Sequence, residues 1–149
     1  MSRLGGLWRS LPWTAALFAL GAAAISGLPP LNGFVSEWLL YLSLFDTLQV
    51  PGSPALAAVF AAVLLGITGA LALACFIKVC GVVFLGTPRS DAARHAQECG
   101  LSMRGPMMVL ALACIAIGLV PSLFWPAVVR AASVWNPAWS RLAVPPSLK

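Results

Sequence analysis

Two charged side chains stand inside otherwise apolar stretches of this 149-residue chain, and both types of side chain can exchange protons. Glu37 is the only carboxylate in these stretches, and Lys78 is the only amine. A charge near the centre of a bilayer costs about 2.5–3.5 kcal/mol on insertion scales, so such residues commonly mark an ion or proton path. We therefore predict proton transfer as the chemistry of Glu37 and Lys78.

A structural role is the alternative for each of these residues. The ammonium group of Lys78 can reach the membrane interface if the residue lies near a helix end. Glu37 can form an ion pair with a cation on another helix. Ser36 and Tyr41 lie near Glu37 at helical spacing, where they either order water or pack against neighbours.

Glu37 follows a short sequence through which a helix cannot continue. The pair Pro29-Pro30 removes backbone donors and clashes with the preceding turn. Asn32 can cap a new helix, and Gly33 tolerates an unusual backbone at its start. We predict that the helix stops near Leu28 and restarts near Gly33.

Such a break would be an unusual environment for a carboxyl group. The freed backbone groups must be covered by protein or must line a wet cavity. Apolar surroundings favour the neutral form of a carboxyl group, whereas a helix N-terminus favours the charged form. Glu37 lies between these influences, which suits a proton relay. The alternative for the break is a plain helical hairpin turn.

The composition indicates lipid as the solvent. Hydrophobic residues make up 60% of the chain and charged residues 9%, where soluble domains carry about 25% charged residues. We predict an all-α integral membrane protein, a single domain over residues 1–149 with about three transmembrane segments. The segments cover residues 11–45 with the break inside, 55–85 and 106–129, followed by a tail over 130–149. An unbroken first segment would measure ~52 Å, but the hydrocarbon core is only about 30 Å thick.

Small residues recur every four positions in the second segment. Residues at this spacing share one face of a helix, and small side chains let a neighbouring backbone approach. We predict that this row packs against other helices and that Lys78 continues it. The row consists of Ala58, Ala62, Gly66, Ala70 and Ala74.

The distribution of arginines predicts the orientation. Arg3 and Arg9 precede the first segment, the linker over residues 46–54 has no cation, and the 86–105 loop has three arginines. Because Lys and Arg collect in cytoplasmic loops, we predict that the N-terminus and the 86–105 loop are cytoplasmic.

Several other functions find no support in the sequence. The net charge of +5 comes without a basic run, so nucleic acid is not the expected partner. The four cysteines form no C-x-x-C pair, and the only histidine, His95, lies in a polar loop. We expect no metal, no cofactor and no catalytic residue. The first apolar stretch continues into more apolar sequence, unlike a cleavable signal peptide.

Three stretches together resemble one family of membrane proteins. Residues 22–38, AAAISGLPPLNGFVSEW, resemble the last broken helix of the proton-translocating subunits related to Mrp antiporters. These subunits serve NADH:quinone oxidoreductase and membrane-bound hydrogenases. Residues 9–15, RSLPWTA, and 74–90, ACFIKVCGVVFLGTPRS, resemble the hydrogenase branch with hydrogenase-4 and formate hydrogenlyase. The resemblance covers most of residues 1–125.

The resemblance implies a role for Glu37 and a set of partners. Glu37 matches the protonatable residue of the broken helix, where some relatives carry Lys, and Lys78 falls on the following helix. Family members have about fourteen spans, so we expect a fragment or a chain that works beside another. The implied partners are other membrane subunits of a hydrogenase or complex-I-like assembly in the cell (inner) membrane.

Three functions follow as hypotheses. The first is a proton-translocating module that couples a partner's electron transfer to ion movement. The second is a structural membrane anchor without its own proton path. The third is a small multidrug-type exporter with one membrane glutamate in a dimer, but the Pro29-Pro30 break argues against it.

Overall fold

The computed structural model describes residues 4–49, 53–137 and 144–145, and the regular structure of these residues is entirely helical. The predicted all-α class is therefore confirmed. Arg3, used above for the orientation, and residues 138–143 and 146–149 of the predicted tail lie outside the described residues. The helices are α1 (Pro12–Ile25), α2 (Asn32–Leu48), α3 (Ser53–Val83), α4 (Asp91–Arg94), α5 (Leu101–Leu119) and α6 (Pro121–Ser133).

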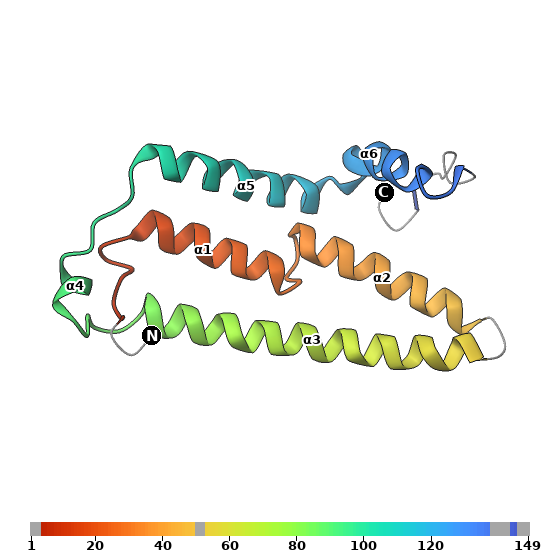
Figure 1. The fold of residues 1–149 in the computed structure, drawn as a ribbon, viewed down its shortest axis with the longest axis horizontal. Coiled ribbons are helices and arrows are strands. Elements are labelled where there is room, and N and C mark those ends of the chain that lie inside the picture. Colours follow the sequence, from red (N-terminus) through yellow and green to blue (C-terminus); the bar gives the residue numbers. More distant parts are fainter. Residues whose placement is uncertain (1–3, 50–52, 138–143, 146–149) are drawn as a thin grey trace.

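The long helices form a layered bundle. Helices α1 and α2 follow each other end to end, with α3 along one side and α5 along the other (Figure 1). The short helix α4 lies at one end of the bundle, and α6 lies beyond the other end of α5 (Figure 1). The break between α1 and α2 therefore lies in the middle layer, between two helices.

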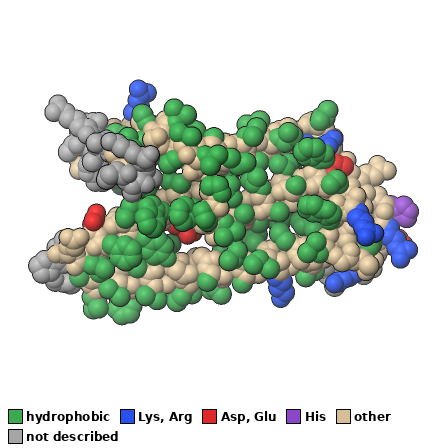
Figure 2. Space-filling model, turned by 180° about the vertical axis from the view of Figure 1, so that it is seen from behind, with side chains coloured by type: hydrophobic (Ala, Val, Ile, Leu, Met, Phe, Trp, Pro, Cys, Tyr) green, Lys and Arg blue, Asp and Glu red, His purple; other side chains and the backbone are tan. Residues whose placement is uncertain are grey.

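Two of the described helices are long and apolar enough to cross a bilayer. They span Pro54–Val83, with a mean hydropathy of 2.4, and Leu101–Leu119, with a mean hydropathy of 1.7. Helix α1 is apolar but shorter. Large hydrophobic side chains such as Phe60 and Leu112 point outward, and such side chains spread over most of the face in Figure 2. Apolar patches of this extent are typical of surfaces that meet lipid or other proteins.

The predicted interruption of the first segment is present in the backbone. Helix α1 ends at Ile25, three residues earlier than predicted, and α2 begins at Asn32. Gly27 adopts a left-handed backbone with φ +67°. The N–H of Leu28 bonds to the carbonyl oxygen of Ala23, and the N–H of Gly27 bonds to that of Ala24. This hydrogen-bond pattern is a Schellman motif, so a glycine ends α1 before the two prolines are reached.

The predicted third segment, over residues 106–129, consists of two helices in the structure. Helix α5 already begins at Leu101, with Pro106 inside it, and it ends at Leu119. A new helix, α6, begins at Pro121. Proline has no N–H to continue the ladder and clashes with the carbonyl group four residues earlier, but it fits the first turn of a helix. The chain therefore has a second helix break.

The prediction of a packed row on α3 is only partly right. Ala58 is buried and Ala62 is half-buried, but Gly66, Ala70, Ala74 and Lys78 are exposed. A helix has 3.6 residues per turn, so each step of four advances about 40° beyond a full turn. Four such steps carry the row off the packed face. The half-buried positions instead follow Leu65, Gly69, Ala72 and Phe76.

A small apolar core closes the end of the bundle near α4. The backbone N–H groups of Gly6 and Trp8 bond to the carbonyl oxygens of Leu85 and Phe84, at 3.0 Å each. Phe18 of α1 contacts Phe84, with 5.4 Å between ring centroids. The N-terminal segment before α1 thereby ties α1 to the end of α3. The buried residues of this core are Leu7, Ala15, Phe84 and Ala93.

Glu98 completes this end by capping α1 from a distant part of the chain. Leu11, at the cap position, makes no side-chain cap hydrogen bond. The carboxylate of Glu98 accepts the backbone N–H of Trp13 at 3.0 Å and the hydroxyl of Thr14 at 2.5 Å. The Thr14 hydrogen bond, followed by backbone donors, holds the pKa of Glu98 below its ordinary value. A carboxylate here also complements the positive end of the helix dipole.

Replacing Glu98 should weaken this cap in a pH-dependent way. We expect Glu98→Gln to lower the thermal midpoint of the protein in detergent at neutral pH. Because the folded-state pKa is depressed, the charged cap stabilises fully above the ordinary glutamate pKa and loses this effect as pH falls through the folded-state value. The difference between native and variant midpoints should therefore shrink on acidification.

The control for this experiment is Asp91→Asn, which removes an exposed carboxylate from the same loop. A midpoint difference for Glu98→Gln that stays constant from neutral to acidic pH would contradict the cap assignment.

Candidate functional site

The carboxylate of Glu37 lies where the helix break meets α3. Its side chain is half-buried on the second turn of α2. A Cβ atom built on Gly27 of the break would lie 2.9 Å from its Oε1 atom. A Cβ atom built on Gly69 of α3 would lie 4.0 Å from its Oε2 atom. The carboxylate therefore occupies the space left by two glycines.

The next turn of α2 packs on α3 in the same way. Tyr41, four residues after Glu37, brings its hydroxyl to 3.3 Å from a Cβ atom built on Gly66. Residues at this spacing share one face of α2. The face that carries Glu37 therefore points at α3, and Gly66 and Gly69 provide the room for it.

The roles predicted for Asn32 and Gly33 differ from those in the structure. Leu31 occupies the cap position of α2, and Asn32 is the first helical residue, so Asn32 is not the cap. The backbone of Gly33 is not in the left-handed region. Gly33 instead lies against the carbonyl oxygen of Ala24, which any Cβ atom would overlap. A glycine is thus required by close approach of α2 to the end of α1.

Polar groups at the break are incompletely paired within the described residues. The Oδ1 atom of Asn32 and the hydroxyl of Ser26 are buried and have no hydrogen-bond partner there. A cavity of about 400 Å³ lies beside the break and α2. Its lining includes Asn32, Ser36 and Glu37. Such a cavity is large enough for several water molecules, each of which takes about 30 Å³, and it offers them polar partners.

Helix α5 fixes the other side of the break. A Cβ atom on Gly118 would overlap the carbonyl oxygen of Pro30 and would lie 2.7 Å from the Cα atom of Leu31. Backbone therefore meets backbone at this point. The break is enclosed by α3 on the Glu37 side and by α5 on the Pro30 side.

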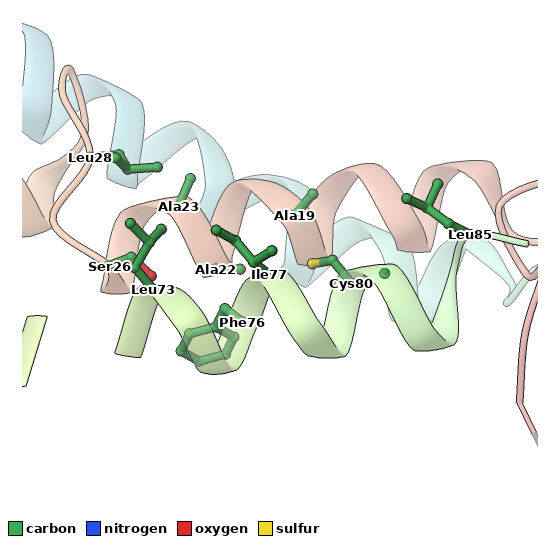
Figure 3. A pocket seen from close by; sticks show the side chains of 11 residues that line it. Ala19, Ala22, Ala23, Ser26, Leu28, Leu73, Phe76, Ile77, Cys80 and Leu85 are labelled. Atoms are coloured by element: carbon green, nitrogen blue, oxygen red, sulfur yellow. The ribbon is translucent and has the colours of Figure 1, made fainter. Parts of the chain in front are cut away.

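A second cavity of about 340 Å³ lies between α1 and α3 (Figure 3). Its lining is apolar apart from the Ser26 hydroxyl and the Cys80 thiol, and it includes Ala22, Leu73 and Phe76. This cavity offers few groups to a proton or an ion. The polar side of the break is the side that faces Glu37.

Lys78 lies apart from this site. It follows Gly69 by nine residues on α3, which is 2.5 helical turns and about 13.5 Å along the axis. Lys78 is therefore on the opposite face of α3 from the Glu37 carboxylate, and its side chain is exposed. Within the part of the chain that the structure describes, Glu37 forms no ion pair. The structure brings Glu37, Asn32 and Gly33 together but not Lys78.

Comparison of the sequence with known proteins identifies its relatives. The family model described as NADH:quinone oxidoreductase/Mrp antiporter, TM, matches residues 1–64, which contain α1, the break and α2. The hydrogenase-4 component B of Escherichia coli (strain K12) is 43% identical over 137 residues, 91% of this chain. The chain belongs to the NADH:quinone oxidoreductase/Mrp antiporter transmembrane family.

Other proteins are similar to most of the chain. Formate hydrogenlyase subunit 3 of Escherichia coli (strain K12) is 39% identical over 80% of this chain. The chloroplastic NAD(P)H-quinone oxidoreductase subunit 5 of Nephroselmis olivacea is 32% identical over 85% of it. The chain spans about one fifth of the length of these relatives, 20%, 20% and 18% respectively. The family resemblance predicted from the sequence is confirmed.

Sequence reasoning missed three residues of this family member's site. Gly27 and Gly69 border the Glu37 carboxylate, and Gly118 contacts the break. Gly27 could have been recognised, since a glycine just before a proline pair is typical of a helix C-terminus. Gly69 lies three residues after Gly66, on the same side of the helix.

Proposed function

We propose that this chain is the broken-helix part of a proton-translocating membrane module that couples a partner's electron transfer to ion movement. The observation that carries the proposal is the position of the Glu37 carboxylate. It lies at a helix break, between backbone segments of the break and of α3, beside a cavity of about 400 Å³. A carboxyl group that water can reach inside an apolar layer is suited to accept and release a proton.

The proposal includes a location and partners. The chain would form one domain in the cell (inner) membrane, with the α1–α2 pair, α3 and the α5–α6 pair as its three segments. Because the chain spans about a fifth of its relatives, the remaining proton path would come from further membrane helices. These helices would belong to a hydrogenase or complex-I-like assembly. Glu37 is the proposed proton-transfer residue, and Lys78, on the far face of α3, would need a separate route.

The alternative is a membrane anchor that carries no protons, which the exposed apolar surface alone would also suit. The deciding experiment compares proton translocation with redox turnover in vesicles that hold the complete assembly. The native chain is measured beside Glu37→Gln. An anchor tolerates this exchange, whereas a transport module does not.

Orientation can be tested separately. We expect a cysteine at exposed Ala92, in the 86–105 loop, to resist an impermeant thiol reagent added outside intact cells. A cysteine at exposed Gln49, at the other end of the bundle, should react. The reason is that three arginines favour the cytoplasmic side for the first loop, and the second has none.

Both variants should be made in a chain whose four native cysteines are replaced by alanine. External labelling of Ala92→Cys with protection of Gln49→Cys would reverse the proposed orientation.

A further inference from the structure

Two polar residues of α2 line two neighbouring cavities. Asn32 and Ser36 border the cavity of about 400 Å³ that contains Glu37. They also border a cavity of about 380 Å³ between α2, the end of α5 and the start of α6. The other residues that line the cavity of about 380 Å³ are mainly apolar and include Leu39, Ile117 and Pro121. Asn32 and Ser36 are thus the polar groups between the two spaces.

Asn32 has hydrogen-bonding capacity that no part of the described chain uses. Its Oδ1 atom is buried and has no partner there. It does not cap α2, because Leu31 occupies that position. An asparagine side chain offers both an acceptor oxygen and donor hydrogens. A buried amide of this kind is costly in a fold unless another group or water satisfies it.

Ser36 lies one turn further along α2 and is also available. Its hydroxyl donates to the carbonyl oxygen of Gly33 at 2.8 Å. The hydroxyl oxygen keeps its lone pairs, so it can still accept a hydrogen bond. Ser36 directly precedes Glu37 in the sequence. The Asn32 amide and the Ser36 hydroxyl therefore provide hydrogen-bond donors and acceptors on α2, between the cavity that contains Glu37 and the cavity of about 380 Å³.

We propose that Asn32 is a positioning residue that orders water between Glu37 and the cavity of about 380 Å³ at the α5–α6 junction. Ser36 is the second polar group on this route. The inference rests on the proposed proton-transfer function and gives it a direction. Protons would pass from Glu37 along α2 toward the α5–α6 junction, away from the end that carries α4 (Figure 1). Pro121, the first residue of α6, lines the cavity at the end of this route.

The first test measures proton translocation per electron in vesicles with the complete assembly. Asn32→Leu keeps the branched shape and the number of side-chain heavy atoms but removes both polar atoms. We expect a loss of about fivefold or more, as for a lost hydrogen-bond partner on the route. Asn32→Ser, smaller but polar, should keep more than half of the native ratio. A purely structural Asn32 predicts the reverse order, since leucine fills the space and serine leaves a void.

Glu37→Gln, measured in parallel, distinguishes a failure of the proposed function from a failure of the role of Asn32 alone. If Glu37→Gln translocates at the native ratio, the proposed function fails. If Glu37→Gln is inactive and Asn32→Leu translocates at the native ratio, only the role of Asn32 is overturned.

A labelling experiment tests the route without depending on variants of Asn32. In a chain whose native cysteines are replaced by alanine, Leu39→Cys places a thiol in the cavity of about 380 Å³ at the α5–α6 junction. Phe60→Cys places one on the outward apolar face of α3. Small water-soluble thiol reagents react with the thiolate, which requires water. We expect labelling of Leu39→Cys to be about tenfold faster than that of Phe60→Cys; equal or slower labelling overturns the route.

Discussion

Glu37→Gln is expected to lower proton translocation by about a hundredfold, the lower end of the range for a positioned proton-transfer group. Glutamine keeps the size and part of the hydrogen bonding of glutamate, but it cannot ionise. The space between Gly27 and Gly69 should therefore accept it. Assembly and the partner's redox reaction should remain, so the measured quantity is the ratio of protons to electrons in vesicles.

Two further variants define the cause of this loss. Glu37→Asp keeps the charge but shortens the side chain by one methylene, and we expect it to retain part of the activity. Asp46→Asn is the matched control, because Asp46 is an exposed carboxylate on the same helix. It should translocate protons at the native ratio. A native ratio in Glu37→Gln would instead support the anchor alternative.

Gly118→Ala is expected to destabilise the protein by about 1–3 kcal/mol, the usual cost of forcing extra atoms into a packed site. The added methyl group would overlap the Pro30 carbonyl oxygen. Backbone cannot rotate away as a side chain can, so α5 or the break must shift. The measurement is unfolding in detergent, followed by circular dichroism as denaturant is added.

Gly105→Ala is the matched control in the same helix. No atom lies within 4 Å of a Cβ atom built there, and alanine favours helix over glycine by up to about 1 kcal/mol. This variant should therefore be neutral or slightly stabilising. If Gly118→Ala behaves like Gly105→Ala, α5 does not clamp the break in the way that the structure indicates.

The helix break and its carboxylate could be predicted because their causes are local. Pro29 and Pro30 interrupt a helix in any surroundings, and Glu37 is recognised as a charge in an apolar run. The family resemblance of the same residues added the expected role. Here the sequence contains the physical information directly, within about ten residues.

Other parts of the site depend on contacts that a sequence does not display. Gly118 matters because the backbone of Pro30 lies against it, more than eighty residues away in the chain. The same holds for Glu98, whose carboxylate reaches α1 over 85 residues. The small-residue row on α3 was predicted correctly only in its first part, because steps of four drift around a helix.

The α1–α2 pair is interrupted at the break, whereas α3 runs alongside both helices without interruption. One end of α1 is held by Glu98 and by the N-terminal pairing with α3, while α2 extends 17 residues beyond the break. At 1.5 Å per residue, α2 is about 25 Å long, so a change of about 5° in its angle at the break would move its far end by about 2 Å. A small change in the angle of the break would therefore produce its largest displacement at the far end of α2.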